Sequence, residues 1–235
     1  MRQRVDLRVW IGVLLLLLIV GLAAPPTAQA QLNVTGQWST LPYNVPINPI
    51  HAAVLPNGKV LIVAGTENDA AVTVNKYAVW DPTAGTFSQG TTPWDLFCNG
   101  MSFLPDGRVF LTGGDLAYEI GDQPFKGLKI TTIFDPITEK FIQVEDMAKG
   151  RWYPTNVGLA DGGQLTFSGL DENGVMNDTV EIYDVGAGWT GPYGPSPTVP
   201  KWYPRMHLLS NGRWSWSAPT RPRGRSIRRT ARGPA

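Results

Sequence analysis

The sequence of 235 residues is poor in the residues that build several common kinds of protein. It has one cysteine, which cannot form a disulfide within the chain, so a disulfide-stapled scaffold is excluded. Helical periodicity is missing between residues 31 and 220, because glycine and proline interrupt almost every window. The 26 glycines show no three-residue period and accompany nine tryptophans, which excludes collagen and argues against plain disorder. An all-β chain with its own hydrophobic core is favoured.

Charged residues are also few, at 17%, and the formal net charge of +1 conceals an uneven distribution. Six arginines and no acid lie in residues 221–235, whereas residues 31–220 hold 11 Lys and Arg against 18 Asp and Glu. An acidic body argues against a folded surface that grips nucleic acid. We therefore expect no nucleic-acid partner.

The amino terminus has the layout of an export signal. Three arginines precede an apolar run from Trp10 to Ala24, and Ala28 and Ala30 then form an A-x-A pattern around Gln29. The run is shorter than the roughly 20 apolar residues that a membrane span needs. We expect residues 1–30 to be a signal peptide cleaved after Ala30, giving a secreted, extracellular chain without a membrane partner. An uncleaved anchor is the alternative.

The body of the chain repeats itself. Residues 55–65 recur as residues 104–114, and weaker copies begin at Leu159 and Leu208, so the period is near 50 residues. Each copy opens with Asn-Gly or a similar glycine-containing turn between apolar runs, which predicts a β-hairpin. A period near 50 with about four short strands per unit is typical of kelch-type β-propellers. We expect residues 31–218 to form an incomplete propeller of about three and a half to four blades.

A second recurring mark supports four strands per unit. An aromatic residue followed by aspartate occurs at Trp80-Asp81, Phe134-Asp135 and Tyr183-Asp184, each time after the hairpin. These pairs lead to another turn and strand, so the hairpin supplies only part of each unit.

The sequence changes character near its carboxy terminus. After the fourth turn the repeat calls for an apolar strand, but only an alternating run from Trp214 to Ala218 follows. Residues 219–235 contain six arginines and one strong hydrophobe, so they cannot bury enough apolar surface to offset their ordering entropy. We expect a disordered basic tail there. Because the fourth repeat stops within a strand, we interpret the tail as the product of a frameshift or truncation.

Two short segments occupy matching positions in the repeat. Residues 94–100 come directly before the second hairpin, and residues 151–155 come directly before the third. Equivalent positions on successive blades lie side by side around a propeller axis. Cys98 and Tyr153 are therefore expected to come into contact.

These segments resemble the copper radical oxidases, galactose oxidase and glyoxal oxidase. The most specific elements are Asp95-Leu96-Phe97-Cys98 and Arg151-Trp152-Tyr153-Pro154, and the resemblance covers residues 31 to about 218. It implies a seven-bladed propeller in which a cysteine and a tyrosine are joined by a thioether bond. By resemblance, Tyr153 would be a copper ligand and the site of a protein radical, and Cys98 its thioether partner.

The resemblance also implies an activity, the oxidation of a small primary alcohol, aldehyde or carbohydrate with reduction of dioxygen to hydrogen peroxide. In the family, copper also uses two histidines and an axial tyrosine from later blades and a carboxy-terminal domain. The sequence has only His51 and His207, to which we transfer no copper role. Copper at such a site needs nitrogen donors. We therefore expect the chain to be inactive alone, with a missing carboxy-terminal propeller portion as a candidate partner.

Other interpretations stay open. Cys98 is also compatible with a small buried hydrophobe, and Trp202-Tyr203-Pro204 repeats the Trp-Tyr-Pro unit, so part of that motif is blade architecture. A non-catalytic kelch propeller that binds carbohydrate or protein through its loops is the alternative function. Acidic residues after the hairpins fit no metal loop and are expected to be solvated: Asp115, Glu119, Asp122, Asp171 and Glu172.

Overall fold

The structure is a computed structural model that describes residues 36–196, 199–217 and 229–231. The chain divides into two units, Met1–Asn44 and Val45–Ala235. In the first unit the described residues, 36–44, contain no strand. The predicted signal peptide, residues 1–30, lies outside the described residues. Across the described ranges, no helix is long and apolar enough to cross a membrane.

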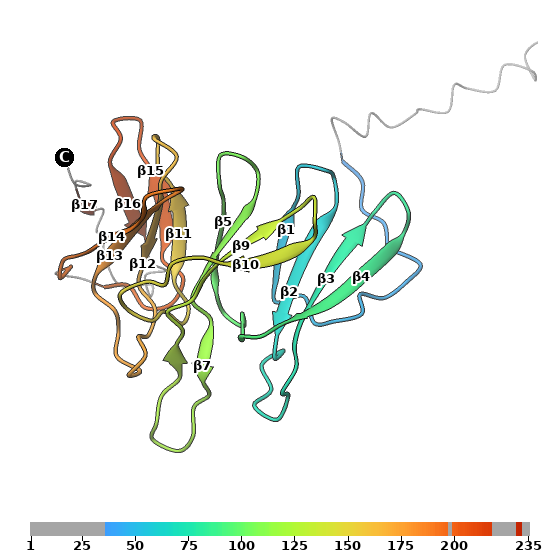
Figure 1. The fold of residues 1–235 in the computed structure, drawn as a ribbon, viewed down its shortest axis with the longest axis horizontal. Helices are drawn as coiled ribbons and strands as arrows, with labels where there is room; N and C mark the ends of the chain where they lie inside the picture. Colours follow the sequence, from blue (N-terminus) through green and yellow to red (C-terminus); the bar gives the residue numbers. More distant parts are fainter. Residues whose placement is uncertain (1–35, 197–198, 218–228, 232–235) are drawn as a thin grey trace, which may run out of the picture. The chain divides into compact units, whose positions relative to one another are not determined.

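The second unit is built from antiparallel sheets that follow one another along the chain (Figure 1). The first sheet has the order β1-β2-β3-β4, the second β10-β9-β6-β5, the third β11-β12-β13-β14 and the fourth β15-β16-β17. The strands of the first two sheets are β1 (His51–Val54), β2 (Val60–Gly65), β3 (Asn75–Asp81), β4 (Thr86–Thr92), β5 (Gly100–Phe103), β6 (Val109–Thr112), β9 (Thr131–Asp135) and β10 (Lys140–Gln143). Those of the last two are β11 (Thr155–Gly158), β12 (Gln164–Phe167), β13 (Val180–Asp184), β14 (Gly188–Tyr193), β15 (Arg205–Leu208), β16 (Trp214–Ser217) and β17 (Arg229–Ala231).

Each sheet opens with the hairpin that the repeats predict. In the first, the amide of Leu55 donates to the carbonyl of Lys59, and Gly58 between them has a φ of 81°. This left-handed conformation carries little penalty for glycine, because glycine has no Cβ. The second hairpin repeats the geometry with Gly107 at a φ of 85°. The repeated Asn-Gly and Asp-Gly pairs are thus the local signal that sets the strand register.

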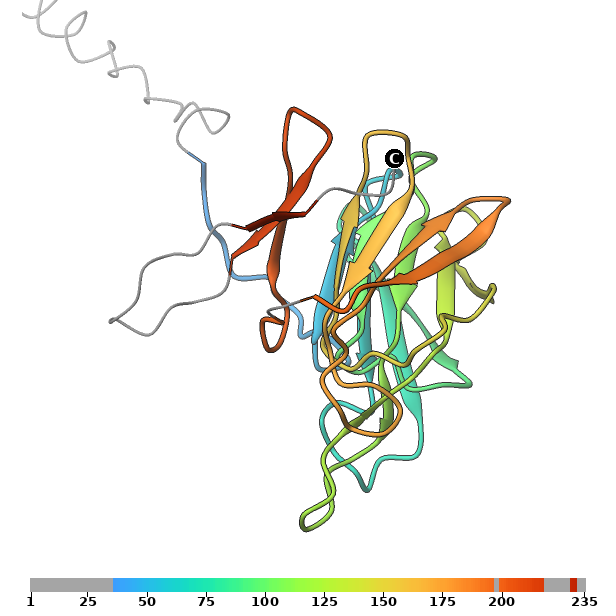
Figure 2. The same cartoon turned by 90° about the vertical axis from the view of Figure 1, so that its left-hand side faces the viewer.

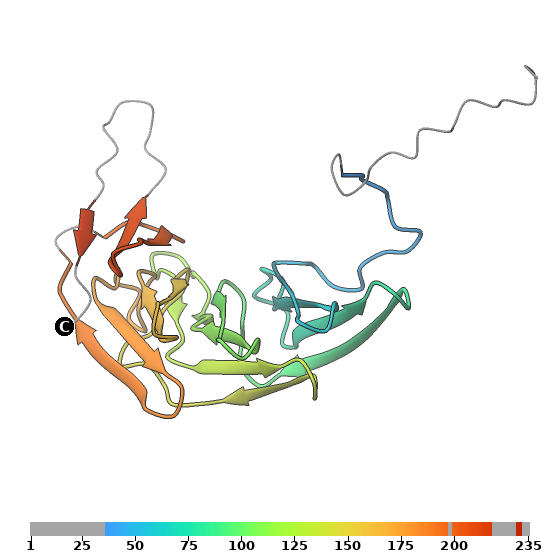
Figure 3. The ribbon, with the colours of Figure 1, turned by 90° about the horizontal axis from the view of Figure 1, so that it is seen from above.

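The core lies between neighbouring sheets. Leu61 and Val63 of β2 belong to one cluster with Leu111 of β6 and Phe134 of β9. The next cluster joins β6 to β13 and β14, and a third joins β12 to β16. Strands β6 and β12 are buried along their whole length, whereas β10 and β14 are largely exposed. Consecutive sheets therefore stack face to face, as Figure 3 shows from above.

The first strands of successive sheets lie next to one another, because β11 contacts both β5 and β15. A separate hairpin of β7 (Asp115–Ala117) and β8 (Lys126–Gly127) projects beyond the ends of these sheets (Figures 1 and 2). The sequence did not predict this hairpin. It begins directly after Gly113 and Gly114, where the repeat pattern ends its second strand.

The predicted all-β class is confirmed, and the described residues contain no helix. The four-strand unit is present in the first three sheets, and the described residues form no closed ring of sheets. Strand β17 falls inside the segment 219–235 that was predicted to be a disordered tail, and the rest of that segment lies outside the described residues. The disordered tail stays a prediction.

Candidate functional site

Three residues occupy the same place in three consecutive sheets. Cys98, Tyr153 and Tyr203 each stand two positions before a first strand, those strands being β5, β11 and β15. Because β11 lies beside both of the others, the three residues converge. The amide of Tyr153 donates to the carbonyl of Cys98 at 2.9 Å, and the amide of Tyr203 donates to the carbonyl of Tyr153 at 3.1 Å. Two backbone hydrogen bonds thus link the three turns.

The backbone at these turns is left-handed although none of the three residues is glycine. The φ angle is 59° at Cys98, 67° at Tyr153 and 43° at Tyr203. Such conformations cost about 1–3 kcal/mol each and persist only where the surroundings enforce them, most often at functional sites. The two backbone hydrogen bonds hold this conformation in place, because their donors are the amides of Tyr153 and Tyr203 and their acceptors are the carbonyls of Cys98 and Tyr153.

The side chains of the three residues also meet. Cys98 is 2% exposed, and the ring of Tyr153 packs against the buried cluster to which Cys98 belongs. The hydroxyls of Tyr153 and Tyr203 lie close enough to the thiol to influence its pKa. The two tyrosine rings lie 4.5 Å apart between centroids. The pair predicted from the sequence, Cys98 and Tyr153, is therefore in contact, and Tyr203 is a second phenol on the same sulfur.

Burial governs the protonation of this cluster. Desolvation raises the pKa of the Cys98 thiol to about 12, and the hydrogen bonds from the two tyrosines lower it in part. The negative charges of Asp115 and Asp95 raise it further. Burial also raises the pKa values of Tyr153 and Tyr203 above their ordinary value. At neutral pH the thiol and both phenols hold their protons, so the thiol is a poor nucleophile as it stands.

His51, the first residue of β1, joins the cluster through Tyr203. Its Nε2 lies 3.3 Å from the Tyr203 hydroxyl, and the same hydroxyl donates to the carbonyl oxygen of Asn99 at 3.2 Å. Burial lowers the pKa of His51 to about 4, so its imidazole is neutral at physiological pH. His207, the other histidine, is exposed on β15.

Aromatic rings pack around Tyr153. Trp152 lies 4.1 Å from Tyr153 between ring centroids and stacks on Phe125 at the same distance. Trp202 lies 5.6 Å from Tyr153 and is 42% exposed. Tyr153 therefore packs against a buried indole and against one that reaches the surface, and the two indoles lie 5.2 Å apart between centroids.

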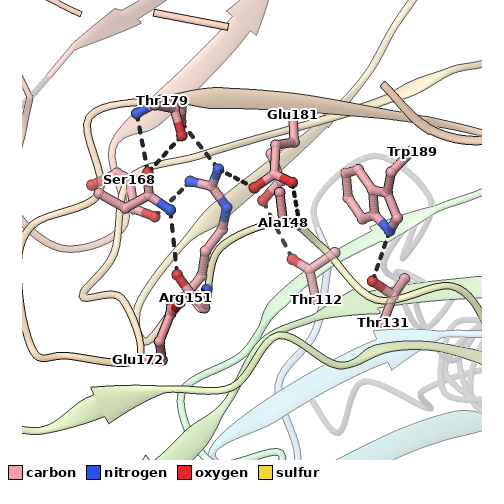
Figure 4. Close-up of polar contacts among 12 residues, drawn as sticks. Thr112, Thr131, Ala148, Arg151, Ser168, Glu172, Thr179, Glu181 and Trp189 are labelled. Atoms are coloured by element: carbon pink, nitrogen blue, oxygen red, sulfur yellow. Dashed lines mark hydrogen bonds and ion pairs between the residues drawn. The ribbon is translucent and has the colours of Figure 1, made fainter. Parts of the chain in front are cut away.

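A buried ion pair holds the segment that leads into Tyr153 (Figure 4). Arg151 is 0% exposed, and its guanidinium contacts Glu181 at 2.9 Å. The guanidinium also donates to the carbonyls of Ser168 and Thr179, each at 3.1 Å. The second oxygen of Glu181 accepts from the amide of Ala148 at 2.7 Å. The pair therefore ties the turn before Tyr153 to β13.

The prediction of solvated loop carboxylates is wrong for Asp115. This residue is 6% exposed, because it opens β7 and its amide donates to the carbonyl of Asp95. Burial, together with the charge of Asp95, raises the pKa of Asp115 to about 7. Glu119 and Asp122 are exposed as expected. Across the described ranges no three His, Cys, Asp or Glu side chains gather as a metal site.

Sequence reasoning missed Tyr203 and His51 as parts of this cluster. The signal was present, since Trp202-Tyr203-Pro204 repeats Trp152-Tyr153-Pro154, but the repeat was interpreted as architecture. His51 carries no local signal, because it meets Tyr203 only through the stacking of the sheets. We refer to Cys98, Tyr153, Tyr203 and His51 together as the Cys-Tyr cluster.

Comparison with known proteins adds the context. No family model matches the chain. The chain is 30% identical over 181 residues to a galactose oxidase of Gibberella zeae, a match that covers 68% of this chain and 25% of that protein. It is 26% identical over 215 residues to the aldehyde oxidase GLOX of Vitis pseudoreticulata, covering 78% and 38% respectively.

A solved structure shares the fold. It is described as a novel fungal alcohol oxidase with catalytic diversity among the AA5 family, in complex with copper, and it matches with a TM-score of 0.57 at 20% identity. The match covers 79% of this chain and 42% of that one. The chain thus spans 25% to 38% of the length of the curated relatives above. Over the part that they share, the chain belongs to the family of galactose oxidase and glyoxal oxidase.

Proposed function

We propose that this chain is a secreted part of a copper radical oxidase, in which Cys98 and Tyr153 form a thioether-linked redox cofactor. The observation that carries the proposal is that Cys98 and Tyr153 occupy equivalent turns of two neighbouring sheets, are joined by a backbone hydrogen bond at 2.9 Å and pack in one cluster. The left-handed backbone at both residues supports it, because strain of this kind is retained where a site requires it.

The proposed fold is an incomplete kelch-type propeller. Three successive four-stranded antiparallel sheets, stacked face to face with their first strands adjacent, support this interpretation. The fourth sheet, β15-β16-β17, continues the series. A seven-bladed ring would need further sheets, which we propose a missing carboxy-terminal propeller portion supplies.

The thioether would form by oxidation of the chain itself. The S–H bond of Cys98 and one ring C–H bond beside the Tyr153 hydroxyl break, and a sulfur–carbon bond forms. Two protons and two electrons leave and are taken up by dioxygen, which becomes hydrogen peroxide. The buried thiol keeps its proton before the reaction, because desolvation raises the pKa of Cys98 to about 12.

The residues present fit copper in donor type. Phenolate oxygen and imidazole nitrogen are suitable donors for Cu(II), and the Cys-Tyr cluster holds two phenols and one neutral imidazole linked through hydrogen bonds. Tyr153 would hold the ion. Copper, when bound, supplies one-electron redox chemistry and activates dioxygen. The rings of Trp152 and Trp202 pack against Tyr153.

The substrates proposed for the whole protein are small primary alcohols, aldehydes or carbohydrates, oxidised with release of hydrogen peroxide. The described residues offer one imidazole to the cluster, so we propose that this chain does not turn over substrate alone. Turnover would require further nitrogen donors from the missing portion.

Mass spectrometry tests the thioether. The purified chain is treated with Cu(II) in air, digested and mapped, with Cys98→Ser as the matched control. We expect a loss of two hydrogens and a linked pair of peptides containing Cys98 and Tyr153. An unmodified Cys98 thiol after copper treatment of the folded protein would refute the proposed cofactor.

A non-catalytic propeller that binds carbohydrate is the second candidate. The observation that favours it is Trp202, whose ring is 42% exposed next to the cluster and is suited to stacking on a sugar. Binding of a monosaccharide panel that is lost in Trp202→Ala, together with an unmodified thiol, would support this candidate instead.

A further inference from the structure

A chain of short hydrogen bonds lies at the base of the projecting β7–β8 hairpin, outside the Cys-Tyr cluster. Tyr118 directly follows β7, and its hydroxyl lies 2.5 Å from Oγ1 of Thr66. The Thr66 hydroxyl donates to Oδ2 of Asp95, also at 2.5 Å. A hydroxyl has one hydrogen, and Thr66 gives its own to Asp95, so Tyr118 is the donor to Thr66. The hydrogen bonds therefore run in one direction, from the phenol through Thr66 to the carboxylate.

The carboxylate at the end of this chain is held in place by the backbone. Its Oδ1 accepts from the amide of Thr66 at 3.0 Å and from the amide of Phe97 at 2.9 Å. Thr66 itself is 6% exposed, so its hydroxyl is largely withdrawn from solvent. Oδ2 of Asp95 is thus positioned to receive a proton that comes through Thr66.

Aromatic rings connect Tyr118 to the Cys-Tyr cluster. The ring of Tyr118 lies 5.3 Å from that of Phe125, which stacks on Trp152 at 4.1 Å. Trp152 in turn lies 4.1 Å from Tyr153 between ring centroids. Electrons pass readily between aromatic rings in van der Waals contact. The series of rings therefore offers an electron a route between Tyr118 and Tyr153.

Tyr118 differs from Trp152 in having somewhere to send its proton. A phenol or an indole becomes strongly acidic when it loses an electron, so its oxidation is easier where a neighbour accepts the proton. None of the described residues accepts a hydrogen bond from Nε1 of Trp152, which is buried. Burial raises the pKa of Tyr118 to about 12, so this phenol is protonated at neutral pH and its oxidation must include proton transfer.

We propose that Tyr118 is a second redox-active tyrosine of this chain and that Thr66 and Asp95 take up its proton. One electron leaves the ring of Tyr118 for an outer-sphere one-electron oxidant, such as a metal complex. The Oη–H bond of Tyr118 breaks as its proton passes to Oγ1 of Thr66, and the original Thr66 proton passes to Oδ2 of Asp95. The products are a neutral tyrosyl radical and a protonated Asp95. The proposal goes beyond the proposed function, because this step needs neither copper nor the thioether.

Photochemical oxidation tests the proposal in the absence of copper. The purified full chain, with its tyrosine rings deuterated or not, is mixed with tris(bipyridine)ruthenium(II) and a cobalt(III) ammine. A flash generates the ruthenium(III) oxidant, and the frozen sample is examined by high-field electron paramagnetic resonance. We expect a tyrosyl signal with its largest g value lowered, because Thr66 then donates a hydrogen bond to the phenoxyl oxygen. Deuteration of the rings narrows a tyrosyl signal and so separates it from a tryptophanyl one.

Variants assign the signal to its residues. We expect Tyr118→Phe to lose it, Thr66→Val to lose it although the phenol is present, and Thr66→Ser to restore it by keeping the hydroxyl. Tyr77→Phe is the matched control, since Tyr77 is also half-buried among aromatic rings but its hydroxyl donates to the backbone carbonyl of Glu139. We expect the control to keep the signal. Urea unfolding shows that each variant is folded.

The thioether and the Tyr118 radical can fail separately. Cys98→Ser cannot form the thioether, so we expect it to keep the low-g tyrosyl signal, and loss of the signal there would overturn the proposal. An unmodified Cys98 thiol after copper treatment would refute the proposed cofactor and leave the role of Tyr118 standing.

Three other results would also overturn the proposal: no low-g tyrosyl signal in the wild-type chain, the signal retained in Tyr118→Phe, or the signal retained in Thr66→Val. A purely structural hydrogen bond between Tyr118 and Thr66 would give the first of these results. The wild-type measurement decides the question even if a variant does not fold.

Discussion

Arg151→Met is the sharpest test of how the site is held in place. The substitution removes the positive charge opposite Glu181, whose side chain is 1% exposed. It also leaves the carbonyls of Ser168 and Thr179 without their guanidinium donors. Breaking a buried ion pair by removing one partner costs about 3–5 kcal/mol. That is a large share of the roughly 5–15 kcal/mol by which a folded domain is stable.

The measurement is urea unfolding followed by tryptophan fluorescence. With a slope of about 2 kcal/mol per molar urea, a loss of about 4 kcal/mol lowers the midpoint by about 2 M. Lys129→Met is the matched control, since Lys129 and Glu172 form an ion pair at 2.8 Å whose side chains are 42% and 28% exposed. We expect that control to lose less than about 1 kcal/mol.

A double variant identifies the cause. Arg151→Met combined with Glu181→Leu leaves no buried charge at this pair, so we expect it to be more stable than Arg151→Met alone. A midpoint for Arg151→Met close to that of Lys129→Met would refute the reasoning. It would mean that the carboxylate of Glu181 becomes hydrated or protonated at little cost in folding free energy.

Three further predictions concern other parts of the chain. Burial and Asp95 raise the pKa of Asp115 to about 7, so the stability that comes from its protonated carboxyl is fully present below about pH 4 and is lost as pH rises through 7. Asp115→Asn should therefore unfold at a higher urea concentration than wild type at pH 8 but not at pH 4. Gly127→Ala should destabilise the protein in the same urea assay, because a Cβ there would collide with the backbone carbonyl of Leu170. Cys98 should react with iodoacetamide far more slowly in the folded chain than in urea at pH 8, because its pKa is about 12; equal rates would show that the thiol is not buried.

Local chemistry made much of the fold predictable from the sequence. The hairpins at Gly58 and Gly107 follow from turns whose left-handed φ favours glycine, and their spacing defines the repeated sheets. The contact between Cys98 and Tyr153 follows from that spacing, because equivalent positions in neighbouring sheets are adjacent. Whether the two residues are covalently joined is a matter of chemistry, and it stays a prediction.

The features that sequence reasoning missed depend on contacts between distant segments. Arg151 and Glu181 are 30 positions apart, and nothing local marks either as buried. Asp115 follows a Gly-Gly pair and was expected in a solvated loop, but it begins a strand that pairs back toward Asp95. Tyr203 meets His51 across 152 positions, a contact that only the stacking of the sheets produces.

The two backbone hydrogen bonds that join Cys98, Tyr153 and Tyr203 make the cluster depend on the docking of the sheets. Each of its two links joins residues from different sheets, so neither link exists until the sheets that carry it have docked. A sheet that forms its own hairpins but has not docked on its neighbour would hold one of the residues without its hydrogen-bond partner. The thioether proposed above would therefore form only in molecules in which the sheets that carry Cys98 and Tyr153 have docked.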